Sequence, residues 1–253
     1  MSDANSLEWA VVAGAAGAIG SRIVERLAGR GLGVVLVGRT PGSLESLAEH
    51  HPRTVVCPAD IRDDASIHAI RQAIDGPVRI AVNAAAAPMG GAVLDVTPEA
   101  VLSAIDVKVN GTLRLVHAVR DQLVEDSRIV LLGGNLGYDP IPEAATAGVG
   151  NAALANLVRQ LSRALGPNGV TCHVVAPGPV WTERLHALLR EAAQSRGVAE
   201  SEVVDEFRSR SPINHLVTVE EVVWAVDLLI APEARALAGG TLLLDAGQRT
   251  SVP

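Results

Sequence analysis

The chain has 253 residues, of which 48% are hydrophobic and 19% charged, and its formal net charge is −7. This length and composition suit one α/β domain with a sizeable core and exclude a disordered chain. The acidic balance argues against a nucleic-acid partner, because binding to phosphates requires a clustered basic face. No apolar run reaches the roughly 20 residues that a membrane span needs, so we expect no membrane partner.

Two further features predict a cytoplasmic location. The first residues carry neither the positive start nor the apolar stretch of a signal peptide. Two widely separated cysteines, Cys57 and Cys172, lie in apolar runs, which is typical of buried free thiols in a reducing compartment.

Short apolar runs alternate with longer helical patterns along the chain. We expect strands at residues 9–13, 34–37, 54–57, 79–82, 128–132, 171–175 and 241–244. Helical patterns cover residues 21–29, 43–50, 65–74, 98–123, 144–165 and 219–230. Because most of the strands are continuous apolar runs, they predict a single-domain, Rossmann-type doubly wound parallel sheet of about seven strands, with helices on both faces.

Residues 182–211 break this alternation, because they are longer and more charged than the other connections. Ligands of doubly wound sheets bind beyond the carboxyl ends of the strands, and long connections there often form lids. We therefore expect one domain over residues 1–253, with residues 182–211 as an insertion or lid on the substrate side.

The first expected strand runs into a glycine-rich turn, GAAGAIG at residues 14–20, and then into a helix. Small residues allow the backbone to approach a pyrophosphate, which the N-terminus of the helix attracts. The second strand ends in Gly38-Arg39, with no acidic residue for the ribose hydroxyls of NAD. Arg39 is placed to pair with a 2′-phosphate, so NADP(H) is favoured over NAD(H).

These motifs resemble those of the short-chain dehydrogenase/reductase family over essentially the whole chain. The resemblance implies that Asp60 and Ile61 hold the adenine, and that the loop at residues 177–182 contacts the nicotinamide. The positions that it implies for cofactor binding, together with Arg39, are Gly14, Gly17, Ala18, Ile19, Gly20, Asp60, Ile61, Asn83, Ala84, Pro177, Gly178, Val180 and Thr182.

The catalytic positions of the family are all changed. Its dehydrogenases use a tyrosine as proton donor, a lysine four residues later that lowers the tyrosine pKa, a serine and an asparagine. Matching residues 151–154 to the family's Lys-Ala-Ala-Leu places Asn151 at the lysine and Ala147 at the tyrosine. Gly134 stands at the serine, and Lys108 at the asparagine. The tyrosine–lysine mechanism is therefore predicted to be unavailable.

Two residues remain as candidate catalytic groups. Lys108 is the only lysine among 21 basic residues, and a buried lysine can lose its proton where an arginine cannot. The alternative role for Lys108 is to fill the space of the missing lysine and bind ribose or a carbonyl. Tyr138, the only tyrosine, is a second candidate donor or a wall residue of the substrate pocket. No Cys/His cluster has the spacing of a metal site.

Three functions stay open at this point. The first is an unorthodox NADP(H)-dependent reductase of a carbonyl or activated alkene, acting on a small molecule. The second is a catalytically silent subunit, with no cofactor required, that pairs with an active family member. The third is a non-redox lyase, dehydratase or cyclase. In this fold the helices expected at residues 98–123 and 144–165 form subunit contacts, so a homodimer, a homotetramer or a heterotetramer is expected.

Overall fold

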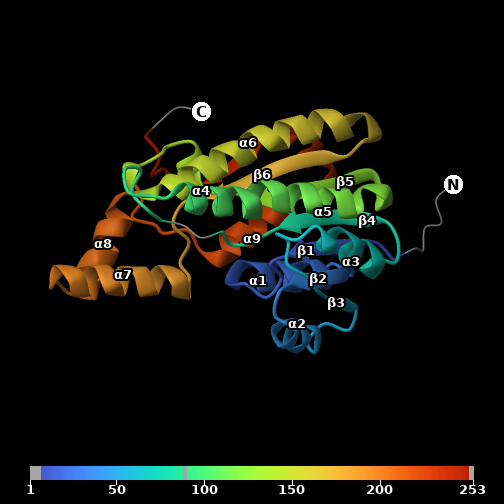
Figure 1. Cartoon of the computed structure of the whole chain (residues 1–253), viewed down its shortest axis with the longest axis horizontal. Helices are drawn as coiled ribbons and strands as arrows, with labels where there is room; N and C mark the ends of the chain where they lie inside the picture. Colours follow the sequence, from blue (N-terminus) through green and yellow to red (C-terminus); the bar gives the residue numbers. More distant parts are fainter. Residues whose placement is uncertain (1–6, 88–89, 251–253) are drawn as a thin grey trace.

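A seven-stranded parallel sheet forms the centre of the computed structural model, which describes residues 7–87 and 90–250 (Figure 1). The strands are β1 (Trp9–Ala13), β2 (Gly33–Gly38), β3 (Thr54–Pro58), β4 (Val78–Asn83), β5 (Leu123–Leu132), β6 (Thr171–Pro177) and β7 (Thr241–Leu244). Their order is β3-β2-β1-β4-β5-β6-β7. The predicted doubly wound sheet is confirmed, and its switch point lies at the carboxyl ends of β1 and β4.

Helices cover both faces of the sheet, as the sequence predicts. One apolar core holds the buried side chains of α1 (Ala18–Gly29), α2 (Pro41–Ala48) and α9 (Val219–Leu228). The other holds those of α3 (Ala65–Ala73), α5 (Gly111–Val119) and α6 (Ala145–Leu165). The buried side chains of these two cores are mostly Ala, Val, Leu and Ile, with Trp9 as an aromatic member of the second core. No helix of the described ranges is long and apolar enough to cross a bilayer.

The prediction of one continuous helix over residues 98–123 is wrong. Helix α4 (Pro98–Ile105) passes into a π-helical turn at Asp106–Asn110, then into α5 and a 3₁₀ turn at Arg120–Gln122. Leu123 already belongs to β5, where it pairs with Val78. The helical pattern therefore ends because strand pairing takes over, and the π-helical turn places Lys108 between two α-helices.

Residues 182–211 form two helices, α7 (Glu183–Arg196) and α8 (Glu200–Ser209), which project from one end of the molecule (Figure 1). Their apolar side chains, among them Leu189 and Val203, are buried in a small core of their own with Leu216. The insertion is therefore a folded helical pair rather than an extended loop.

Arg128 on β5 is fully buried and holds the C-terminal end of α9. Its Nε donates to the Leu229 carbonyl at 2.8 Å, and its Nη2 donates to the Ala231 carbonyl at 3.4 Å. Its Nη1 donates to the Asp126 carbonyl at 2.7 Å. The last carbonyls of a helix lack partners within the helix, so this guanidinium ties α9 to the sheet.

We expect Arg128→Met to lower the free energy of unfolding by about 3 kcal/mol, because it leaves several buried carbonyls without a donor. Urea unfolding followed by circular dichroism measures the change. Arg235→Met is the matched control, since Arg235 pairs with the Asp126 carboxylate at 2.8 Å but is exposed; its effect should stay within about 0.5 kcal/mol. Equal, small effects of the two variants would contradict this role of Arg128.

Candidate functional site

The glycine-rich turn after β1 is shaped by close approaches of its backbone. Gly14 has a φ of +81°, and a Cβ there would lie 2.8 Å from the backbone of Ala84. A Cβ at Gly20 would overlap the Gly14 carbonyl oxygen. Gly17 is the N-cap of α1 and offers no side-chain cap, so the first-turn N–H groups of Ala18 and Ile19 lack that partner. The turn thus presents free backbone donors beside the switch point.

The end of β4 brings two further predicted cofactor residues, Asn83 and Ala84, to the same edge of the sheet. Asn83 is buried, and its Nδ2 donates to the Thr112 hydroxyl at 2.9 Å. Its Oδ1 accepts from the Ala85 N–H at 3.1 Å. The Ala84 N–H donates to the Ala13 carbonyl at 2.8 Å, which joins β4 to the strand that carries the turn.

The loop after β6, which begins at Pro177, is held on both sides. The Gly178 N–H donates to the Leu244 carbonyl at 2.9 Å. Val180 forms a bridge with Val217. Thr182 caps α7, because its hydroxyl accepts from the Leu185 N–H at 3.4 Å. The predicted nicotinamide loop is therefore fixed at the foot of the α7–α8 insertion.

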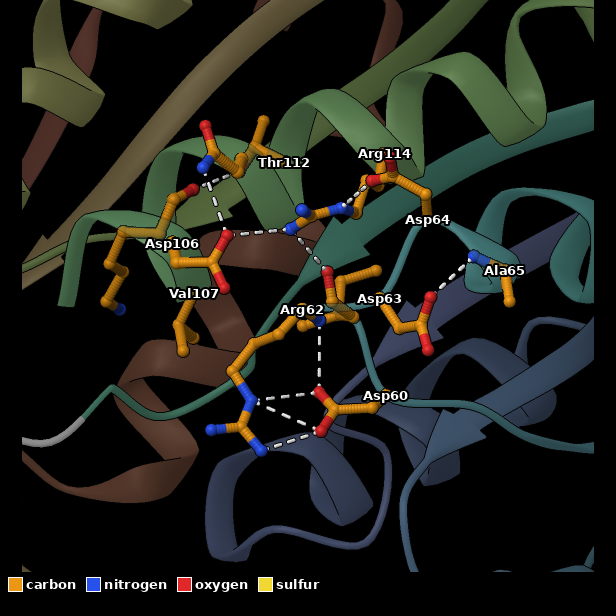
Figure 2. A network of polar contacts seen from close by, with 12 residues as sticks. Asp60, Arg62, Asp63, Asp64, Ala65, Asp106, Val107, Thr112 and Arg114 are labelled. Atoms are coloured by element: carbon orange, nitrogen blue, oxygen red, sulfur yellow. Dashed lines mark hydrogen bonds and ion pairs between the residues drawn. The ribbon is translucent and has the colours of Figure 1, made fainter. Parts of the chain in front are cut away.

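Arg62 holds Asp60, the residue that the family resemblance assigns to the adenine. Arg62 binds the Asp60 carboxylate through Nε and Nη2, at distances down to 2.7 Å (Figure 2). These hydrogen bonds from Arg62, with a smaller influence of Arg39, lower the pKa of Asp60. Arg39 itself forms no ion pair with any residue of the described ranges. The Arg62 backbone N–H also donates to Asp60 Oδ1 at 3.0 Å, so both oxygens of the Asp60 carboxylate are engaged by Arg62.

A second ion network connects the loop of Asp60 and Ile61 to the π-helical turn (Figure 2). Arg114 on α5 binds Asp64 at 2.7 Å and Asp106 at 2.9 Å. The same guanidinium donates to the Ile61 carbonyl at 3.2 Å. Arg114 therefore fixes the loop expected to hold the adenine against the segment that carries Lys108.

Lys108 extends from the π-helical turn to the carboxyl end of β5. The Thr112 hydroxyl donates to the Lys108 carbonyl at 2.6 Å, so the turn is tied to the Asn83 amide described above. The Lys108 ammonium donates to the Leu132 carbonyl at 2.6 Å. Burial, and to a lesser degree the charge of Arg184, lowers the pKa of Lys108 to about 8. The lysine is thus a group that gains and loses a proton near neutral pH.

Gly134 and Asn151, which the family resemblance places at the serine and the lysine, meet near this same strand end. Asn151 is 5% exposed, and its Nδ2 lies 2.8 Å from the place that a Cβ on Gly134 would occupy. The Pro177 carbonyl lies 3.7 Å from that place. Ala147 lies one turn earlier on α6 and is also buried. The glycine at 134 and the asparagine at 151 are therefore sterically coupled, a relation that no sequence pattern reveals.

We expect Gly134→Ser to destabilise the chain by about 1–3 kcal/mol, because the new Cβ meets the Asn151 amide. Adding Asn151→Ala should recover most of that loss, and a double-mutant cycle of unfolding free energies measures the coupling. Additive effects of the two substitutions would contradict the steric relation.

Tyr138 has a different setting from Lys108. Its hydroxyl hydrogen-bonds the Thr241 hydroxyl at the start of β7, and its ring packs on the core between the sheet and α3, α5 and α6. The Lys108 ammonium, by contrast, contacts Leu132 at the end of β5. Sequence reasoning missed Arg184, whose relation to Lys108 depends on the fold of residues 182–211. No metal-binding group of His, Cys, Asp or Glu side chains is present within residues 7–87 and 90–250.

A glycine turn that enters a helix beside the switch point of a parallel sheet defines the Rossmann-type class of α/β proteins. Residues 14–249 match the family model described as enoyl-(acyl carrier protein) reductase. The chain belongs to the short-chain dehydrogenase/reductase family, whose named relatives are reductases and other oxidoreductases.

One relative by sequence and two solved structures are similar to this chain. The short-chain reductase protein NovJ of Streptomyces niveus is 27% identical over 252 residues, which cover 94% of this chain and 93% of NovJ. The L-sorbose reductase of Gluconobacter frateurii, solved with NADPH and L-sorbose, has a TM-score of 0.88 at 20% identity, covering 98% of both chains. An NADPH-bound short-chain oxidoreductase of Pseudomonas aeruginosa PAO1 with an atypical catalytic center has a TM-score of 0.86 at 23% identity, covering 97% of this chain and 98% of that one.

Proposed function

We propose that the chain is an NADP(H)-dependent reductase of a carbonyl or activated alkene, in which Lys108 replaces the family's tyrosine as proton donor. The observation that carries this proposal is the Lys108 ammonium, 2.6 Å from the Leu132 carbonyl at the end of β5. That strand end adjoins the two positions, Gly134 and Asn151, at which the usual serine and lysine are missing.

The residues of the turn fit a nicotinamide dinucleotide. Ala18 and Ile19 offer first-turn N–H groups to a pyrophosphate. Arg39 offers a guanidinium without a carboxylate partner in the described ranges to a 2′-phosphate. An adenine amino group at Asp60 would share the carboxylate with Arg62. Along the chain, these groups therefore correspond in turn to the pyrophosphate, the 2′-phosphate and the adenine of NADP(H).

The chemistry divides between the cofactor and Lys108. NADPH held by the turn and by Arg39 would supply the hydride for such a reduction. The Lys108 ammonium then gives a proton to the substrate atom that gains electrons, and the neutral amine takes a proton from water. A pKa of about 8 suits both steps, because the ammonium form predominates at neutral pH and its loss is not prohibitive.

Two structural neighbours support this assignment. The Gluconobacter frateurii protein is a reductase that was solved with NADPH. The Pseudomonas aeruginosa protein binds NADPH although its catalytic center is atypical. NADPH binding together with an atypical catalytic center is thus known for a protein of this fold.

Cofactor preference tests the assignment of Arg39. We expect NADPH to bind more tightly than NADH, and Arg39→Glu to reverse that preference by weakening NADPH binding about 100-fold. Cofactor fluorescence titrations measure both affinities. Arg53→Glu makes the same charge change at another exposed arginine, whose guanidinium contacts the Gly31 carbonyl, and should leave the preference unchanged. No binding of either nucleotide at millimolar concentration would remove the reductase proposal.

A silent subunit is the second candidate, and one observation favours it. Leu102 on α4 and Val149 on α6 are 63% and 47% exposed, and their two helices pack against each other. These helices are the predicted subunit contact, so a second copy or another family member would cover them. Native mass spectrometry of the chain with and without its cellular partners distinguishes a homo-oligomer from a heterotetramer.

The remaining candidates are separated by simple measurements. A lyase, dehydratase or cyclase would convert its substrate without net change in NADPH absorbance, whereas the reductase oxidises NADPH. The buried free thiols of Cys57 and Cys172 support a cytoplasmic location, since oxidation would disrupt the core around them.

A further inference from the structure

The acceptor sites of the Asp60 carboxylate are taken up by a neighbour in its own loop. Its Oδ1 accepts from the Arg62 backbone N–H at 3.0 Å and from Arg62 Nε at 3.1 Å. Its Oδ2 accepts from Nε at 3.2 Å and from Nη2 at 2.7 Å. A carboxylate has about four acceptor sites, and these contacts use all of them. The amino group of a ligand would therefore have to take one of these sites from Arg62.

Arg62 keeps one edge of its guanidinium for a ligand. The contacts with Asp60 use the edge formed by Nε and Nη2. A guanidinium has five N–H donors, so the edge formed by Nη1 and Nη2 retains three of them. Figure 2 shows Nη1 pointing away from Asp60. The side chain is 43% exposed, yet Asp60 fixes its orientation, so this donor edge is both accessible and preorganised.

The cleft beside Asp60 contains a second arginine, whose donors are used inside the protein. The cleft is lined by residues of the two ion networks described above, Asp60, Arg62, Asp63, Asp64, Asp106 and Arg114. Arg114 binds Asp64 at 2.7 Å and Asp106 at 2.9 Å, and it donates to the Ile61 carbonyl at 3.2 Å. Arg62 is thus the arginine of this cleft that presents an open edge, and that edge only donates.

We propose that Arg62 donates from this edge to the purine base of the cofactor, so that the site accepts a 6-oxo purine at least as well as adenine. The inference rests on the proposed function for the placement of the base beside Asp60. An arginine edge pairs with the O6 and N7 acceptors of a 6-oxo purine, whereas a carboxylate accepts from the amino group of a base. Since Arg62 occupies the carboxylate, Asp60 is a positioning residue that holds the guanidinium.

Two nucleotides that differ only at the purine 6-position test this contact. NADPH carries an amino group there, and reduced nicotinamide hypoxanthine dinucleotide phosphate carries an oxygen. Cofactor fluorescence titrations of the wild-type chain give both dissociation constants. We expect the hypoxanthine form to bind at least as tightly as NADPH, because it offers the Arg62 edge two acceptors. Clearly tighter binding of NADPH would overturn the inference.

Variants identify the residue responsible for the preference. Arg62→Leu should shift the ratio of the two dissociation constants about 10-fold toward NADPH, because the Asp60 carboxylate is then open to the amino group. Arg120→Leu is the matched control, since Arg120 is also exposed and pairs with a nearby carboxylate, Asp121, at 3.5 Å. Asp63→Asn alters the exposed carboxylate that accepts from the Ala65 N–H at 2.9 Å.

Both controls should leave the ratio unchanged, and thermal unfolding without nucleotide checks that each variant folds. An unchanged ratio in Arg62→Leu, or an equal shift in Arg120→Leu or Asp63→Asn, would overturn the inference.

Mononucleotides separate this inference from the proposed function. If NADPH binds but the ratios contradict the expectation, the base contact is wrong and the reductase proposal stands. If neither dinucleotide binds, the reductase proposal fails, and titrations of 5′-IMP and 5′-AMP followed by amide chemical shifts decide the inference. Tighter binding of 5′-IMP that is lost in Arg62→Leu would support the base contact. Tighter binding of 5′-AMP, or no binding of 5′-IMP in the tens-of-millimolar range, would overturn it.

Discussion

Replacing Lys108 with methionine is expected to lower kcat/KM for NADPH-dependent reduction by at least ~100-fold, because the reaction loses its proton donor. The wild-type rate should fall as pH rises above about 8, where the ammonium loses its proton. The variant should lack that limb of the pH profile. Steady-state rates across pH measure both effects, once a reducible substrate is found by screening.

Lys108→Arg is the conservative control for this prediction. Arginine keeps the positive charge but does not lose its proton at accessible pH, so the variant should bind NADPH normally and still reduce slowly. Full activity of either variant, or an unchanged pH profile in Lys108→Met, would show that Lys108 is not the donor.

The ammonium form of Lys108, which we expect to support catalysis, is expected to destabilise the fold. Its pKa is lower in the folded chain than the usual 10.4, so between about pH 8 and 10 the unfolded chain binds more protons. The free energy of unfolding should therefore rise with pH across that window. Lys108→Met removes this slope and should stabilise the fold below pH 8, which is typical of a residue kept for function.

Replacing Ala18 with glutamate is expected to weaken NADPH binding at least ~100-fold, because a carboxylate at the first position of α1 opposes the pyrophosphate. The fold should be unharmed, since Ala18 is exposed and an acidic residue in the first turn favours a helix. Calorimetric titration measures the affinity, and thermal unfolding without nucleotide checks the fold.

Ala18→Gln separates charge from size in this test, because it adds almost the same volume without the charge. We expect it to weaken binding far less than Ala18→Glu does. Equal affinities in the wild type and Ala18→Glu would mean that the nucleotide does not lie against the N-terminus of α1.

The strands were predictable because burial on both faces leaves a local trace. Runs such as Val34 to Val37 have no polar alternation, and a parallel sheet between two helical layers is the ordinary reason for that. The helix expected across residues 98–123 was less predictable, because its end is set by a partner far away in the sequence. Leu123 leaves the helical pattern to pair with Val78 on β4, and helical periodicity carries no information on that pairing.

The candidate site likewise contains some residues that the sequence could reveal and others that it could not. Lys108 was found from composition, since one lysine among many arginines stands out at the position that the resemblance assigns to the family's asparagine. The contact between Asn151 and Gly134 was not, because it depends on how α6 packs against the end of β5. Arg184 was missed for the same reason, since the influence of its charge on the Lys108 pKa depends on the fold of the α7–α8 insertion.

A crystal structure of the chain with NADPH tests most directly whether an intact nucleotide site serves a changed catalytic centre. We predict electron density for the pyrophosphate against Ala18 and Ile19, with the 2′-phosphate beside Arg39 and the Lys108 ammonium still at the end of β5. An ordered protein whose residues 14–20 stay empty at saturating NADPH, or are covered by its own side chains, would contradict the account.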